Sequence, residues 1–348
     1  MNVVKLFCPG KSLAGHISTI KNLSTNDILY ITDTIDVEML TEIIKSTGAP
    51  GYIVGDNAGF VKYDLPIFSV PYRGLDLEWR ELQIQNFLPA NTDTDFCFNF
   101  IINKAHLHRH LCIKLVEYFN LLSFVYTWSG VKENFDLSDT LNEINQTPHR
   151  QWEEDFVFKL LQPLAIQPRW TSPSYTIEQK TNFAVTNYGT NKWTWNNIFK
   201  DLMSKSAISL ITESQWTQKS CVFTEKTIYA VMALTIPIWI GGYGHAEYFK
   251  SMGFDVFEDY INHDYQYRDT LIERCYDAFD LNLGFLNSLE QAQDLRTKLM
   301  PRLLANRELM MSDVFYKHTI NTLQQWPSDL AQTMAHRWKR SLTHDLSL

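Results

Sequence analysis

Residues 221–257 read CVFTEKTIYAVMALTIPIWIGGYGHAEYFKSMGFDVF and alternate between helical and strand patterns. The spacing of apolar residues predicts a helix from Lys226 to Leu234, a strand from Pro237 to Ile240, and a helix from His245 to Met252. Gly253 follows the second helix, at a position where glycine commonly ends helices. This order of elements is typical of a parallel sheet with helical crossovers.

Outward from this segment, short apolar runs predict further strands along most of the chain. The predicted strands are Val3–Phe7, Ile28–Thr32, Tyr52–Val54, Pro66–Val70, Phe96–Ile102, Phe124–Thr127, Ala207–Thr212 and Phe254–Phe257. Helical stripes are expected over 37–44 and 107–122, and helices dominate after residue 257, with Leu271, Cys275 and Phe279 on one stripe. Residues 131–195 show no clear periodicity and are expected to mix helix and loop.

The strand pattern restarts after a polar linker at residues 89–93, which predicts more than one domain. A chain of 348 residues is also too long for one ordinary core. We therefore expect an α/β protein with two domains that divide near residue 92.

Composition narrows the class of protein. The net charge of -8 and the pI near 5.7 disfavour a nucleic-acid-binding protein. No apolar run reaches the length of a transmembrane segment, and residues 1–6 do not resemble a signal peptide. Five widely spaced cysteines without a C-x-x-C pair favour reduced thiols, and with them a cytoplasmic location.

The run Thr224-Glu225-Lys226 has the chemistry of a nucleotide site. Thr224 is a suitable N-cap, which places Glu225 and Lys226 in the first helical turn. The start of a helix offers unpaired backbone N–H groups and a positive dipole end, which suit a diphosphate. Glu225 can accept hydrogen bonds from ribose hydroxyls and Lys226 can neutralise phosphate charge. A capped helix with a solvated Glu-Lys pair explains the same residues and stays open.

A second group, Gly241-Gly242-Tyr243-Gly244, follows the strand that ends at Ile240. Glycines at the end of a buried strand allow the backbone to pass close to a ligand or to turn tightly. Ligands of open α/β sheets bind outside the carboxyl ends of the strands, so this group and Thr224-Glu225-Lys226 are expected to face one crevice. A tight turn alone would also explain the glycines.

The run from Cys221 to Phe257 resembles the donor-site segment of GT-B-fold glycosyltransferases, in particular a phage and environmental family related to the alpha-1,3-fucosyltransferases. The resemblance implies that Glu225 binds the nucleotide ribose and Lys226 the diphosphate. It extends upstream to residues 98–104 and His108-Arg109, and covers roughly residues 95–285. The resemblance implies a GT-B-like fold, in which two Rossmann-like domains face each other across a cleft. The expected division is 1–92 on the acceptor side, 93–300 for the nucleotide sugar, and 301–348 as helices that can return to the first domain.

In that upstream segment the family uses a basic residue to meet the phosphates. The resemblance implies Arg109 for this role, with Asn103 and Lys104 as further candidates in the preceding loop. No motif in the N-terminal domain matches the family, so the catalytic base is chosen on other grounds. Asp56, which follows the strand at 52–54, and Glu78 are the candidates, although a turn-forming role also suits Asp56.

The expected reaction is the transfer of a sugar from a nucleotide-sugar donor to a hydroxyl of a glycan or another acceptor, without a metal or a further cofactor. His106, His108 and His110 suggest a metal site, but only His106 and His110 share a helical face and no carboxylate or Cys stands at ligand spacing. The alternative is a non-catalytic nucleotide- or glycan-binding protein with the same fold. An oxidoreductase is disfavoured, because no G-x-G-x-x-G opens a helix after a strand.

Overall fold

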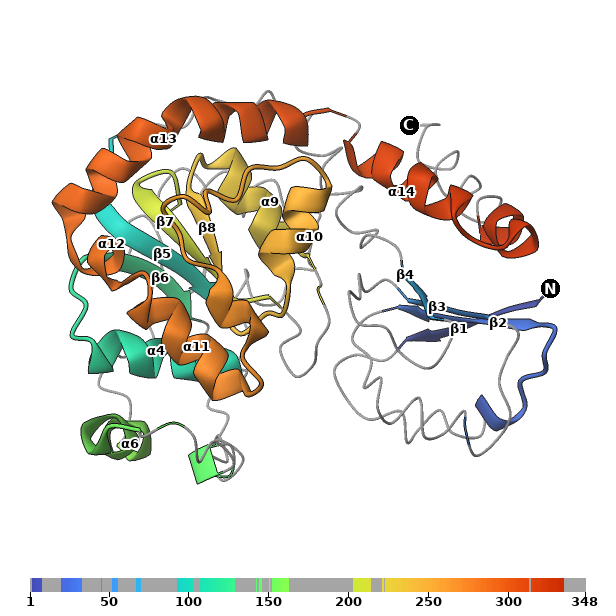
Figure 1. Ribbon diagram of the computed structural model, residues 1–348, viewed down its shortest axis with the longest axis horizontal. Helices are drawn as coiled ribbons and strands as arrows, with labels where there is room; N and C mark the ends of the chain where they lie inside the picture. Colours follow the sequence, from blue (N-terminus) through green and yellow to red (C-terminus); the bar gives the residue numbers. More distant parts are fainter. Residues whose placement is uncertain are drawn as a thin grey trace, which may run out of the picture.

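The computed structural model describes two four-stranded parallel sheets and the helices around them (Figure 1). The described residues are 2–7, 20–32, 45, 52–55, 67–69, 93–102, 107–128, 142, 144–145, 150, 152–162, 203–213, 221, 223–312 and 314–334. A mixed α/β chain with parallel sheets, as the alternating patterns predict, is confirmed.

The first sheet contains strands in simple chain order. It consists of β1 (Asn2–Phe7), β2 (Asp27–Thr32), β3 (Tyr52–Gly55) and β4 (Ile67–Ser69), in the order β1-β2-β3-β4. Every neighbouring pair is parallel. Because each strand lies beside the next one in the chain, the order of these four strands never reverses.

The second sheet has a different order. It consists of β5 (Phe96–Ile102), β6 (Phe124–Trp128), β7 (Ser206–Ile211) and β8 (Ile236–Trp239), arranged as β6-β5-β7-β8. All neighbours are parallel, and Phe98 of β5 pairs with both Phe124 and Ile208. The chain leaves β5 toward β6 on one side and continues with β7 and β8 on the other, so the strand order reverses between β5 and β7.

Helices follow the strands of the second sheet and then form the C-terminal part of the chain. They are α4 (Leu107–Tyr118), α6 (Glu154–Leu161), α9 (Glu225–Met232), α10 (His245–Ser251), the 3-10 helix η3 (Asp264–Tyr267), α11 (Leu271–Asp280), α12 (Leu283–Asn287), α13 (Leu289–Met310) and α14 (Val314–Gln324). A further helical turn covers residues 328–334.

Helix α13 lies at the amino ends of the strands in the second sheet. Its Arg296 is buried and donates to the carbonyls of Ala233 and Leu234, which precede β8, and to the hydroxyl of Thr94, which precedes β5. These bonds satisfy carbonyls at the end of α9. The carboxyl ends of the strands therefore lie on the opposite edge from this contact. The expected boundary between residues 300 and 301 lies within α13.

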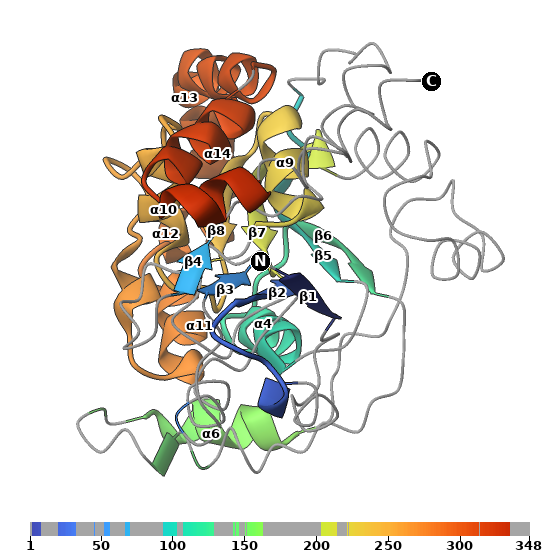
Figure 2. The ribbon, with the colours of Figure 1, turned by 90° about the vertical axis from the view of Figure 1, so that its right-hand side faces the viewer.

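The chain after α13 returns to the first sheet (Figures 1 and 2). One apolar cluster contains Ile28, Tyr30 and Val54 of that sheet together with Leu323, Trp326, Leu330 and Met334. The hydroxyl of Tyr52 donates to the carboxylate of Asp329 at 3.1 Å. Residues 323–334 thus bury one side of β2 and β3, although they are far away in the sequence.

Two local predictions near residue 253 have opposite outcomes. Gly253 ends α10 with a φ of 95°, and its N–H donates to the carbonyl of Lys250, so the predicted helix end is confirmed. The strand predicted for Phe254–Phe257 is wrong, since these residues form a loop. The backbone N–H and carbonyl of Asp255 pair with the Asn306 side chain instead of another strand, and Phe257 has a φ of 59°, which no extended strand adopts.

Among the helices that the structure describes, none has the length and apolar content needed to cross a membrane.

Candidate functional site

The candidate site lies at the carboxyl edge of the second sheet, where the strand order reverses. Ligands of open α/β sheets bind at such a reversal, outside the strand ends. Two side chains at the start of α4 span the gap between β5 and β7. His108 Nε2 lies 2.8 Å from the carbonyl oxygen of Glu213, and Arg109 Nη2 donates to the carbonyl of Thr212 at 3.2 Å. Both side chains are buried.

Glu213, two residues beyond the end of β7, holds the start of α9. Its buried carboxylate accepts hydrogen bonds from the Thr224 N–H at 3.0 Å, from the Thr224 hydroxyl, and from the Thr227 hydroxyl at 2.6 Å. Burial raises the pKa of Glu213, while the nearby Lys226 ammonium and the three donors act in the opposite direction. A carboxylate of the chain itself thus lies at the positive end of this helix.

Sequence reasoning missed Glu213. The available signal was an acidic residue directly after a continuous buried strand, at the strand end where α/β proteins place polar groups. Its partner Thr224 lies eleven residues later, so local spacing alone did not connect the two.

Thr224 is the N-cap of α9, as its position in the sequence predicts. Its hydroxyl accepts from the Lys226 N–H, and the Lys226 ammonium donates to the same hydroxyl at 3.1 Å. Lys226 is only 7% exposed. The Lys226 charge is therefore directed toward Thr224 and Glu213, which differs from the solvated Glu-Lys pair of the simpler interpretation. Glu225 is the first residue of α9, and its side chain lies outside the described part of the structure.

The glycine group forms a closely packed turn between β8 and α10. Gly241 has a φ of 75°, and a Cβ added there would lie 3.2 Å from the His108 Cβ. A Cβ on Gly242 would lie 2.2 Å from His245 Nδ1. Gly244 has a φ of 65° and is the N-cap residue of α10. Packing alone accounts for Gly241 and Gly242, and the same packing brings this turn against the start of α4.

Buried cations surround this edge of the sheet. Arg274 of α11 donates from Nε to the carbonyl of Gly241 at 3.2 Å, and Arg109 and Lys226 approach from α4 and α9. The carboxylate of Glu213 contacts this group through Thr224. Buried cations near the start of a helix suit an anionic ligand.

Five of the predicted site residues come together here, namely Arg109, Thr224, Lys226, Gly241 and Gly242. Tyr243 lies beside them in the turn, with its ring 5.5 Å from that of Tyr267 in an edge-to-face arrangement. Four other candidates, Asp56, Glu78, Asn103 and Lys104, lie outside the described residues.

The histidines of α4 have separate environments. His108 contacts the Glu213 carbonyl, whereas burial lowers the pKa of His110 to about 4, with a smaller effect from Lys114. His106 lies outside the described residues. In the part of the chain that the structure describes, no three His, Cys, Asp or Glu side chains are grouped as a metal site requires.

No protein-family model, curated protein or solved structure matches this chain, so the residues of the site themselves carry its functional interpretation.

Proposed function

We propose that this protein is a metal-independent glycosyltransferase, with two Rossmann-like domains that face each other across a cleft. The donor nucleotide sugar binds at the carboxyl edge of the second sheet. The observation that carries the proposal is the reversal of strand order between β5 and β7, next to the capped start of α9. Ligand sites of open α/β sheets lie at such reversals, and helix starts bind phosphate groups.

In this arrangement the diphosphate of the donor lies near Arg109 and Lys226, and the ribose near Glu225. The two cations and the dipole of α9 stabilise the negative charge that develops on the leaving diphosphate, which is the task a metal performs in other transferases. Glu213 holds Thr224 and Thr227 and so orients the start of α9 toward the ligand. Preoriented dipoles need no rearrangement during the reaction, which makes them effective.

The acceptor is a glycan or another hydroxyl compound that reaches the donor from the first domain. In a transfer that inverts configuration, a carboxylate of that domain removes the proton from the attacking hydroxyl. Asp56, the residue after the end of β3 in the sequence, is the first candidate for this base, with Glu78 as the second. A cytoplasmic location, favoured by the cysteine pattern, belongs to the same proposal.

The proposal is tested by calorimetry of the full chain with ADP, CDP, GDP and UDP, each with and without EDTA. We expect at least one nucleotide to bind with an affinity that EDTA does not change. Loss of binding on addition of EDTA contradicts the metal-free mechanism. No binding of any of the four nucleotides contradicts the assignment of the site.

Glu225→Gln then tests the ribose contact. We expect weaker binding of the ribonucleotide and a smaller preference over the 2′-deoxynucleotide, because the amide loses the charge and one acceptor. Glu154→Gln is the matched control, since Glu154 is also the first residue of a helix, α6, and is exposed. If Glu225→Gln and Glu154→Gln change the ratio of ribonucleotide to 2′-deoxynucleotide affinity equally, Glu225 does not contact the ribose.

Transfer is measured separately from binding. Release of the nucleoside diphosphate from nucleotide sugars in the presence of glycan acceptors indicates an enzyme. Binding without release, over a panel of donors and acceptors, indicates the alternative of a non-catalytic binding protein.

A further inference from the structure

A cavity of about 430 Å³ lies between α10 and the segment that runs from Val256 to Tyr267. Its volume falls within the range of about 300–1,000 Å³ typical of small-molecule sites. Ala246 and Glu247, at the start of α10, line its side nearest the glycine turn. Tyr267 also lines it and packs edge-to-face against Tyr243 of that turn. The cavity is therefore adjacent to the proposed donor site but contains none of its residues.

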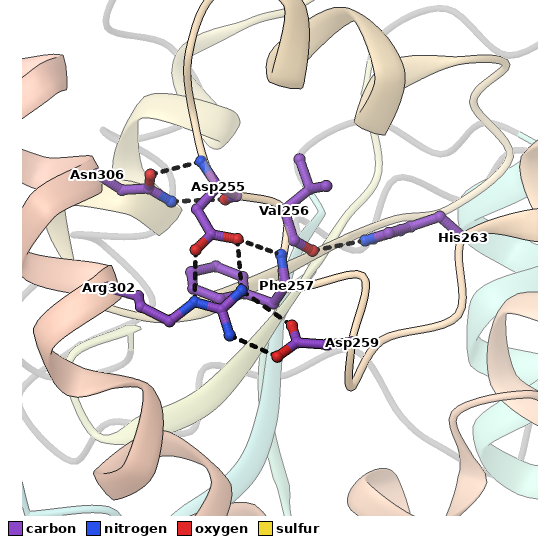
Figure 3. A network of polar contacts seen from close by, with 7 residues as sticks. All are labelled: Asp255, Val256, Phe257, Asp259, His263, Arg302 and Asn306. Carbon is purple, nitrogen blue, oxygen red and sulfur yellow. Dashed lines mark hydrogen bonds and ion pairs between the residues drawn. The ribbon is translucent and has the colours of Figure 1, made fainter.

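The wall of the cavity is held in place by α13 (Figure 3). Arg302 forms ion pairs with both Asp255 and Asp259. Asn306 donates to the Asp255 carbonyl at 2.7 Å and accepts from the Asp255 N–H at 2.8 Å. These contacts fix the backbone on both sides of Phe257, so the wall is organised before any ligand arrives.

The lining offers more acceptors than donors. Glu247 accepts from the Tyr267 hydroxyl at 2.7 Å, and Glu258 accepts from the Lys250 ammonium at 2.6 and 2.8 Å. A carboxylate has about four lone-pair positions, so each retains acceptor sites after this one contact. Asp264 adds another exposed carboxylate at the rim. Adjacent hydroxyls donate hydrogen bonds in pairs and suit such a group of acceptors.

Two tyrosine rings line the same cavity, and the Lys298 ammonium already lies 4.8 Å from the centre of the Tyr260 ring. Tyr267 is 47% exposed and Tyr260 is partly buried, and both line the cavity. An aromatic face packs well against the C–H side of a sugar ring, while nearby acceptors bind the hydroxyls around its edge. The carboxylates alone do not distinguish a sugar from a cation. The tyrosine rings can bind a cation as well as a sugar. The ion pairs that already neutralise Glu258 and Asp259 favour the sugar.

We propose that this cavity binds a mono- or disaccharide and forms the glycan-acceptor subsite of the protein. The proposal rests on the proposed transferase function, because it assigns the acceptor to a surface beside the donor. It replaces the placement of the acceptor given above, in which the acceptor reaches the donor from the first domain. The acceptor is held by residues 247–267 of the second sheet's own unit, and the first domain supplies the base.

The test is saturation-transfer NMR on the full chain without nucleotide. The probes are lactose and the methyl glycosides of glucose, galactose, mannose and N-acetylglucosamine, each followed by titration. We expect at least one to bind, and Glu247→Gln or Tyr267→Ala to weaken it by about tenfold, the effect of one lost charge-assisted hydrogen bond or ring contact. Glu290→Gln, an exposed change on α13, is the control and leaves affinity unchanged.

Three results overturn the proposal, two with the sugar probes and one with spermidine. One is that no probe binds, and the other is that a probe binds equally well to Glu247→Gln, Tyr267→Ala and the wild type. Spermidine is titrated in parallel. If spermidine binds, none of the sugars binds, and Glu247→Gln abolishes the binding of spermidine, the cavity is a cation site and the proposal fails. Nucleoside diphosphate affinity is measured on the same variants and should not change. If a sugar binds but no nucleotide does, the sugar subsite is supported and the transferase function is rejected. If a nucleotide binds but no sugar does, only the sugar subsite is rejected.

Discussion

Arg302 and Asn306 connect helix α13 to the loop that lines the cavity, and Arg302→Ala removes the charged part of this connection (Figure 3). The guanidinium donates from Nη2 to Asp255 at 2.8 Å, from Nη1 to Asp259 at 2.8 Å, and from Nη2 to Asp259 at 2.9 Å. It also lies 5.2 Å from the centre of the Phe257 ring. The substitution therefore removes two ion pairs and one cation–π contact.

The expected loss follows from these contacts and from their exposure. The side chains of Arg302 and Asp255 are 35% and 33% exposed, so this bidentate pair is worth roughly 1–2 kcal/mol after solvent screening. Asp259 is 53% exposed, and its pair adds about 0.2–1 kcal/mol. The ring contact adds about 0.5 kcal/mol. Because neighbouring contacts are not additive, we expect a loss of about 2–3 kcal/mol in the free energy of unfolding.

The pH dependence gives a second, independent signature. Hydrogen bonds from Arg302 lower the pKa of Asp259 below its usual value of 3.8. A carboxylate whose pKa is lowered by folding contributes stability above its ordinary pKa and loses it as the pH falls through the lowered value. The stability difference between wild type and Arg302→Ala should therefore shrink as the pH falls from 5 toward and below the usual Asp pKa of about 3.8.

The measurement is urea unfolding followed by tryptophan fluorescence at neutral and acidic pH. Arg302→Lys retains the charge but cannot bridge both carboxylates, so it should lose about 1 kcal/mol. Arg307→Ala, on the same helix, is the control and should lose less than Arg302→Ala. An Arg302→Ala protein within about 0.5 kcal/mol of the wild type at neutral pH, or a difference that does not shrink in acid, refutes the reasoning.

Three further predictions concern the candidate site and its surroundings. Arg109→Ala should weaken binding of a nucleoside diphosphate by roughly 1.5–3 kcal/mol in calorimetry. It should affect the free nucleoside far less, and equal losses would remove Arg109 from the phosphate site. Gly242→Ala should cost about 1–3 kcal/mol in urea unfolding, because the new methyl group displaces buried His245. Gly284→Ala, in helix α12 with its closest contact at 3.4 Å, should be neutral or stabilising, and similar losses would contradict the packing argument. The wild type should lose stability as the pH falls from about 6.5 to 4, by at most about 3 kcal/mol, since the lowered pKa of His110 keeps it neutral in the fold. His110→Asn should flatten the curve of unfolding free energy against pH in this window, and parallel curves would exclude His110.

The sequence determined the features that depend on short stretches of chain. Strand β7 is buried at every position, and its sequence is a nearly continuous apolar run that Ser209 interrupts. Thr224 was recognisable as an N-cap because its hydroxyl bonds to a backbone N–H only two residues away. Gly253 was recognisable because a left-handed residue at a helix end strongly favours glycine.

Some features of the site were beyond any local pattern. The contact of His108 with Glu213 joins residues 105 positions apart, and it exists only because β5 lies between β6 and β7. That order is set by how the faces of the whole sheet are covered, which local apolar periodicity does not record. Glu213 could be recognised as an acid after a strand, but the sequence did not reveal that its carboxylate lies at the start of α9.

The loop at Asp255 shows the physical reason most clearly. Residues 254–257 are apolar enough to predict a strand, and their local preference is compatible with one. Arg302 and Asn306, about fifty residues later, satisfy the polar groups of Asp255 and stabilise a left-handed Phe257 that costs about 1–3 kcal/mol. The sequence determined which segments are apolar and where helices begin and end, through interactions between near neighbours. Only the tertiary structure decided which distant side chains satisfy the remaining polar groups, because that depends on the packing of α13 against the sheet.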